Sequence, residues 1–152
     1  MLLEDEIKQQ KFKSDYHKLA VNIIYTHGWL INKQTNIFKK FDITAAQFNI
    51  LRILRGQHPN PVPVSLLKDR MLDKMSDASR LVERLRAKGL VDRKICSEDR
   101  RRVNVLITKK GLDLLTVLDG YESEFESFLK NLNVDEAIKT NRLLDKLRGN
   151  EK

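Results

Sequence analysis

Between residues 64 and 110, two short helical segments precede two strand-like runs, and this order constrains the fold more than any other feature of the sequence. The first segment, VSLLKDRML, spans Val64–Leu72, and the second, MSDASRLVERLRAKGL, spans Met75–Leu90. Ser76 is a favourable N-cap for the second helix, and Gly89 is a favourable C-terminal stop. Two short helices joined by a few residues are typical of a helix-turn-helix.

The second helix has one apolar face. At 100° per residue, four side chains fall within about 100° of one another and are expected to face the core: Ala78, Leu81, Val82 and Leu85. Helices that enter the major groove contact bases mainly through their N-terminal residues. We therefore expect base contacts from Ser76, Asp77, Ser79 and Arg80. Arg80 is suited to two hydrogen bonds with guanine, whereas Asp77 either accepts from cytosine or caps the helix. Contacts with phosphates or internal salt bridges are expected from Arg84, Arg86 and Lys88.

Two runs of alternating apolar and polar residues follow this helix, and they predict a hairpin. Their apolar members are Val91, Ile95, Val103, Val105 and Ile107. Three consecutive arginines, Arg100, Arg101 and Arg102, lie at the tip. A helix-turn-helix followed by such a hairpin predicts a winged helix-turn-helix with the arginines at the wing tip. Arginines suit phosphate oxygens and the narrow minor groove. At least one of them is expected to pair with Glu98 or Asp99 and so to hold the tip in shape.

Helical segments flank this winged part on both sides. Apolar residues recur at spacings of three and four along the first 40 residues, which predicts one long helix there, and again after Gly111. Thr44–Gln47 fits a capping box, and Asn133–Glu136 offers another helix start. We therefore expect a mainly α-helical fold with a small β-hairpin wing. The expected organisation is a single domain over residues 1–152, with the winged helix-turn-helix at 41–110 and helical parts at 1–40 and 111–152.

The positive charge is concentrated in the winged part. The chain has a net charge of +8, and residues 74–110 contain 12 Lys and Arg against 5 Asp and Glu. A concentrated basic patch attracts polyanions, among which nucleic acid comes first. A solvated basic face and a charged turn without a partner are the alternatives. Together with the helix-turn-helix, the patch favours sequence-specific binding of double-stranded DNA, and the alternative function is a winged-helix protein-interaction module that does not read DNA.

Other classes of protein find little support in the sequence. There is no P-loop, no GxGxxG and no His/Cys cluster with metal-ligand spacing. We therefore expect no enzyme activity, no cofactor and no metal. No apolar run is long enough to cross a membrane. Cys96 is the single cysteine, so it forms no internal disulfide, and a cytoplasmic location is expected. A packing role is expected for Cys96 rather than a redox role.

The stretch ASRLVERLRAKGLVDRKICSEDRRRVNVLITKKG, Ala78–Gly111, resembles the MarR family of bacterial transcription regulators. In that family a recognition helix ends in KGLV-R, and the wing has a D-x-R motif followed by V-x-L/I-T and a glycine. The matching positions are Asp99, Arg101, Val105, Ile107, Thr108 and Gly111. The T-x-x-Q-F-x-x-L helix at Thr44–Leu51 and the flanking helices are also similar to the family.

This resemblance implies a homodimer in which the helices of residues 1–40 and 111–152 of both chains interlock. It implies a palindromic operator, with recognition helices in successive major grooves and wings in the flanking minor grooves. Arg101 would be the wing arginine, and Asp99 would orient it. The family's usual role is repression of a nearby promoter, relieved by a small-molecule effector.

Overall fold

The chain separates into two units, residues 1–115 and residues 116–152, with the boundary inside helix α6 (Lys109–Asp119). The computed structural model describes residues 1–149. Residues 150–152, the end of the C-terminal part expected at 111–152, lie outside the described residues. The first unit contains the winged part, and the second contains the end of α6 with α7 (Glu122–Ser127) and α8 (Val134–Leu147).

The N-terminal flank is divided, which differs from the single helix expected over the first 40 residues. Helix α1 spans Leu3–Glu6, and the long helix α2 begins only at Asp15 and ends at Phe38. The start of α2 is set by Ser14, whose side chain accepts a hydrogen bond from the His17 N–H at 3.1 Å. Periodicity alone could not locate this start, because the preceding residues carry apolar side chains at compatible spacings.

Helix α3 (Ala45–Gln57) supplies the central core of the winged part. It follows the short 3-10 helix η1 (Lys39–Phe41) and begins with the expected capping box. The Gln47 N–H donates to the Thr44 hydroxyl, and the Thr44 N–H donates to the Gln47 side-chain oxygen, both at 3.1 Å. Ile50, Leu51 and Leu54 of this helix are almost completely buried. The capping box therefore fixes the point from which a buried stripe extends.

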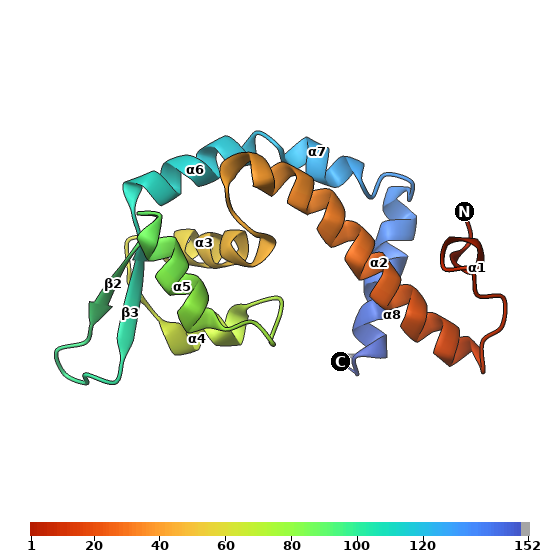
Figure 1. Ribbon diagram of the computed structural model, residues 1–152, viewed down its shortest axis with the longest axis horizontal. Coiled ribbons are helices and arrows are strands. Elements are labelled where there is room, and N and C mark those ends of the chain that lie inside the picture. The colour runs from red at the N-terminus through yellow and green to blue at the C-terminus, as the bar shows by residue number, and fades with distance from the viewer. Residues whose placement is uncertain (150–152) are drawn as a thin grey trace. The chain divides into compact units, whose positions relative to one another are not determined.

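The wing belongs to a three-stranded antiparallel sheet. Strands β2 (Val91–Ile95) and β3 (Val103–Ile107) form the expected hairpin, which extends beyond the helices of the first unit (Figure 1). Strand β1 (Val62–Pro63) was not predicted. It pairs with β3 through Val62 and Val105 and makes the order β1-β3-β2. A two-residue strand has no alternation to detect, and its proline is tolerated because β1 lies at the edge of the sheet. The expected fold class, mainly helical with a small hairpin wing, is confirmed.

The two helices of the helix-turn-helix are α4 (Val64–Arg70) and α5 (Ala78–Ala87). Their inward side chains meet the sheet, and the most deeply buried of these residues are Leu67, Val82, Leu85, Val91 and Val105. Ala78, Val82 and Leu85 are buried as the helical wheel predicts, whereas Leu81 is only half-buried. Helix α5 is thereby fixed on one side and leaves its polar side free.

A tight junction joins the end of α5 to the start of α6. Gly89 adopts a left-handed φ of +72°, which ends α5. The Thr108 hydroxyl donates to the Gly89 carbonyl at 2.7 Å and accepts from the Gly111 N–H at 3.1 Å. A Cβ at Gly111 would lie 2.4 Å from the Leu90 carbonyl oxygen. The threonine and glycine that follow the wing are therefore explained by the close approach of α6 to this corner.

The second unit has a well-defined start to its last helix. The Asn133 and Glu136 side chains and backbone N–H groups bond reciprocally at 2.9 Å, so the expected cap is a full capping box. Large apolar side chains of α8 remain exposed, among them Ile138, Leu143 and Leu147. Among residues 1–149, no helix has both the length and the apolar character that crossing a membrane requires.

Candidate nucleic-acid interface

The N-cap of α5 lies one residue after the expected Ser76, at Asp77, for which capping was one of two expected roles, and the helix begins at Ala78. Asp77, and not Ser76, is the cap: its carboxylate accepts the Arg80 N–H at 3.1 Å. Ser76 precedes the helix, is half-buried, and donates its N–H to the Asp73 carbonyl at 3.2 Å. The Asp77 carboxylate satisfies the N–H of the third helical residue and adds a favourable charge at the positive end of the helix, which explains the difference.

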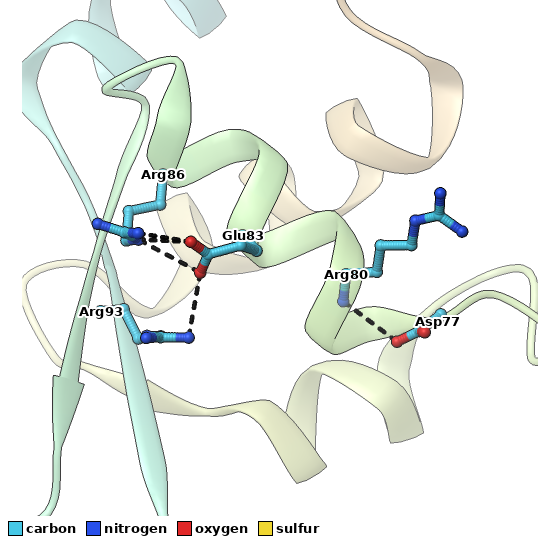
Figure 2. A network of polar contacts seen from close by, with 5 residues as sticks. All are labelled: Asp77, Arg80, Glu83, Arg86 and Arg93. Carbon is cyan, nitrogen blue, oxygen red and sulfur yellow. Dashed lines mark hydrogen bonds and ion pairs between the residues drawn. The ribbon is translucent and has the colours of Figure 1, made fainter.

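The outward side of α5 presents polar side chains that the rest of the chain does not cover. Ser79, Arg80 and Arg84 are exposed. Within residues 1–149, neither Arg80 nor Arg84 forms an ion pair. Figure 2 shows the Arg80 guanidinium extended away from the Glu83 and Arg86 side chains. These three residues are therefore placed where a groove-binding helix would present them.

The wing tip is held by its backbone and leaves its arginine side chains exposed. The Asp99 carboxylate accepts the Arg101 N–H, and the Asp99 carbonyl accepts the Arg102 N–H, both at 3.0 Å. The Cys96 N–H donates to the Arg102 carbonyl at 2.9 Å and closes the turn. The expected ion pair with Glu98 or Asp99 is wrong: in the described part of the chain, no side chain of Arg100, Arg101 or Arg102 forms one. Asp99 shapes this turn through N–H groups, so the guanidiniums remain available.

A carboxylate on α5 connects the recognition helix to the first wing strand. Glu83 accepts the Arg86 Nε–H at 3.1 Å and pairs with Arg93 of β2 at 3.0 Å (Figure 2). The hydrogen bond from Arg86, with the positive charges of Arg86 and Arg93, lowers the pKa of Glu83 below its ordinary value. The expected salt-bridge role is thus confirmed for Arg86, and Lys88 likewise pairs with Asp42 at 3.6 Å. We call Glu83, Arg86 and Arg93 the helix–wing brace.

A cleft of about 260 Å³ lies between the start of α4, helix α5 and the sheet. Its lining brings together Ser79 of α5 with Arg101 and Arg102 of the wing. The sequence predicts all three residues as DNA contacts, but on two separate elements, the helix and the wing. Arg93, which also lines the cleft, was missed. Arg93 is the arginine of the KGLV-R pattern, so the signal was present but had not been given a role.

Other chemistry finds no site among the described residues. Between positions 1 and 149, no group of three His, Cys, Asp or Glu side chains is arranged to hold a metal ion. Cys96 is a half-buried free cysteine at the end of β2. The geometry that remains is a pair of basic elements, α5 and the wing tip, on either side of one cleft.

Comparison with known proteins gives a consistent result. The model of the MarR family matches residues 41–102. The HTH-type transcriptional repressor IacR of Pseudomonas putida is 27% identical over 142 residues, which are 93% of this chain and 80% of IacR. A MarR transcription factor from Planctomyces limnophilus has 31% identity and a TM-score of 0.68, and the match covers 89% of this chain and 98% of that one. A mutant of MarR from E. coli, solved with operator DNA, has 25% identity and a TM-score of 0.78, with 91% and 99% covered.

Proposed function

This chain belongs to the MarR family of DNA-binding transcription regulators, which are not enzymes, and from that premise we propose that it is a repressor that binds a palindromic operator as a homodimer. We propose further that α5 enters the major groove, that the wing arginines enter the minor groove, and that a small molecule releases the protein from DNA. The observation that carries the proposal is the presence of exposed arginines without ion pairs on both elements that border the 260 Å³ cleft.

The chemistry of these residues suits a duplex. Arg80, near the start of α5, has the planar donor pair that matches the O6 and N7 acceptors of guanine. In this proposal Ser76 and Ser79 contact phosphates or base edges, and Arg84 contacts a phosphate. Asp77 already accepts the Arg80 N–H. Its carboxylate has further lone pairs, which could accept a hydrogen bond from a cytosine amino group. Arg100, Arg101 and Arg102 provide the positive charge that a narrow minor groove attracts.

The homodimer is supported by apolar surface on the flanking helices. Tyr16 and Ile24 of α2 are 82% and 72% exposed, and Leu143 of α8 is 57% exposed. Exposed large apolar side chains recur along α2, at Leu19, Ile23 and Tyr25 as well, and such a gathering marks an interaction surface more often than single exposed residues do. We assign residues 1–40 and 111–152 to dimerisation and residues 41–110 to DNA binding, as the family resemblance implies.

Release by a ligand is supported by a second hollow. It has a volume of about 410 Å³ and is lined by the apolar side chains of Phe41, Leu90 and Leu114 and by Lys88 and Lys110. This volume is within the range of small-molecule sites. Both ammonium groups bond to backbone carbonyls around the end of α5, Lys88 to Asp42 and Lys110 to Lys88. An anionic ligand would compete for these bonds and so disturb the end of the recognition helix.

Fluorescence anisotropy with duplexes from the chain's own upstream promoter, across salt concentrations, tests the DNA-binding proposal. Arg101→Ala should weaken binding to every duplex and reduce the salt slope by about 1, because one phosphate contact is lost. Arg80→Ala should in addition relax the preference at one base pair by roughly tenfold to a hundredfold. Arg142→Ala removes the same charge from α8, an element to which no DNA contact is assigned, and is the matched control.

Two results would contradict the proposal. Equal affinity for promoter and unrelated duplexes would exclude sequence-specific reading. A monomer without DNA affinity would instead favour the alternative, a winged-helix module that binds a protein.

A further inference from the structure

Two large apolar side chains are almost fully exposed in the turn between α4 and α5. Leu72 is 88% exposed and Met75 is 92% exposed, whereas their neighbour Met71 is 2% exposed and anchors the turn in the core. Single exposed apolar residues are common on protein surfaces. A pair in one short turn, directly before the helix that carries the proposed base contacts, calls for a specific explanation.

The turn is held in place by hydrogen bonds. The Leu72 N–H donates to the Asn49 side chain of α3 at 2.9 Å, and the Met75 N–H donates to the Asp73 carboxylate at 2.9 Å. The Lys74 ammonium bonds to the Asp69 carbonyl. Because the backbone is fixed at these points, the outward positions of Leu72 and Met75 follow from the fold.

The turn leads straight into the N-terminal end of α5 (Figure 1). Met75 lies two residues before the N-cap Asp77. In a helix-turn-helix, this end of the second helix is the part that approaches the base edges. A side chain placed just before it is therefore carried to the same groove as Ser79 and Arg80.

The major groove offers one apolar group on its base edges, the C5-methyl of thymine. The other base-edge groups in that groove are hydrogen-bond donors or acceptors, which a leucine or methionine cannot satisfy, or single C–H edges, which offer less apolar surface than a methyl group. Lys74, directly before Met75 in the sequence, carries a positive charge suited to a flanking phosphate. A thymine-containing step of a duplex therefore fits both the apolar side chains of Leu72 and Met75 and the positive charge beside them.

We propose that Leu72 and Met75 contact thymine methyl groups in the major groove and thereby add a preference for T·A pairs next to the bases read by α5. This inference rests on the proposed function, since it requires α5 to enter the groove. Each methyl group covered by an apolar side chain should contribute about threefold to fivefold in affinity.

Replacement of single thymines by uracil in the operator tests the inference, because uracil lacks the methyl group and keeps every hydrogen-bonding edge. Wild type should lose about threefold to fivefold at one or two positions per half-site. Met75→Ala or Leu72→Ala should remove the sensitivity at its own position, so that the protein change and the base change are not additive. Ile95→Ala, an exposed apolar residue of β2 at 63%, should leave the uracil sensitivity unchanged.

The inference is overturned if wild type and both turn variants respond equally to uracil at every position. It is also overturned if the turn variants change only self-association in sedimentation, since the turn would then contact protein. Neither substitution removes a buried side chain, so circular dichroism should show unchanged folding. A third outcome is that wild type prefers its operator and loses affinity on Arg101→Ala while the turn substitutions and the uracil changes act additively. In that case this inference alone fails. If wild type shows no operator preference, the proposed function fails with it.

Discussion

The winged part and the flanking helices differ in how far their apolar side chains are buried within one chain. In the winged part, Leu67, Leu85 and Val105 are completely buried within one chain. On the flanks, Ile24 of α2 and Leu143 of α8 remain 72% and 57% exposed. A single chain therefore closes the core that positions the DNA-binding surface, but it leaves apolar surface on the helices assigned to dimerisation. The comparison supports a division in which one chain completes the core of the winged part, whereas the apolar surface of the flanks is left for the proposed contact with a second copy.

The largest expected effect concerns the closed core. Leu85→Ala should lower the free energy of unfolding by about 2–5 kcal/mol, because it leaves a cavity between α5 and the sheet. Leu143→Ala is the matched change on a flank. Its cost in urea denaturation should be smaller and should grow with protein concentration, since its burial is proposed to come from the partner. Equal costs that do not depend on concentration would contradict the distinction between the two regions.

The next effect concerns the exposed flank. Ile24→Glu should weaken self-association by about 30-fold, because a carboxylate would be buried without a partner in an apolar interface. Asn22→Glu introduces the same charge at an exposed polar position of α2 and should have little effect. Sedimentation velocity over a dilution series measures both. If Ile24→Glu associates as wild type does, α2 does not form the dimer interface at that position.

The smallest effect concerns the helix–wing brace. Glu83→Gln should release Arg86 and Arg93 for phosphate contacts, which steepens the salt slope and lowers the ratio of specific to nonspecific affinity by less than about tenfold. Anisotropy with promoter and unrelated duplexes measures this ratio. Asp113→Asn, which removes the carboxylate that pairs with Lys109 on α6, is the control.

The same brace predicts a pH dependence with a definite sign. The pKa of Glu83 is lowered from 4.5, so the brace is fully present above that value and is lost as the pH falls through the lowered pKa. Wild type should therefore approach Glu83→Gln in its specificity ratio only below about pH 4.5. A wild-type ratio that already matches the variant at neutral pH would show that the brace does not position the wing.

Patterns within single elements predicted much of this fold. The apolar stripe of α5, the capping box at Thr44 and the hairpin strands each depend on neighbouring residues, and the structure has them where they were expected. The pattern did not predict that α2 begins at Asp15, and the cap expected at Ser76 was wrong, whereas the capping role left open for Asp77 is confirmed; several residues could serve and only the folded backbone selects one.

Features that depend on distant residues could not be predicted. Strand β1 exists because β3 offers it a partner, not because Val62 and Pro63 form a pattern. The pairing of Glu83 with Arg93 requires the angle between α5 and β2. The cleft shared by Ser79 and Arg101 likewise appears only when helix and wing are placed together. The residues proposed to contact DNA were found in the sequence, but their arrangement around one cleft was not.

The central claim is that two copies of this chain, joined by their flanking helices, present two winged parts to one palindrome. Sedimentation equilibrium of the chain with a palindromic promoter duplex and with a half-site duplex tests it most directly. We expect two chains to bind each palindrome and the free protein to have twice the chain mass of 17.8 kDa. We expect the half-site centres to lie about 10 base pairs apart or a multiple of that spacing. A free protein of 17.8 kDa that binds the half-site as tightly as the palindrome would contradict it.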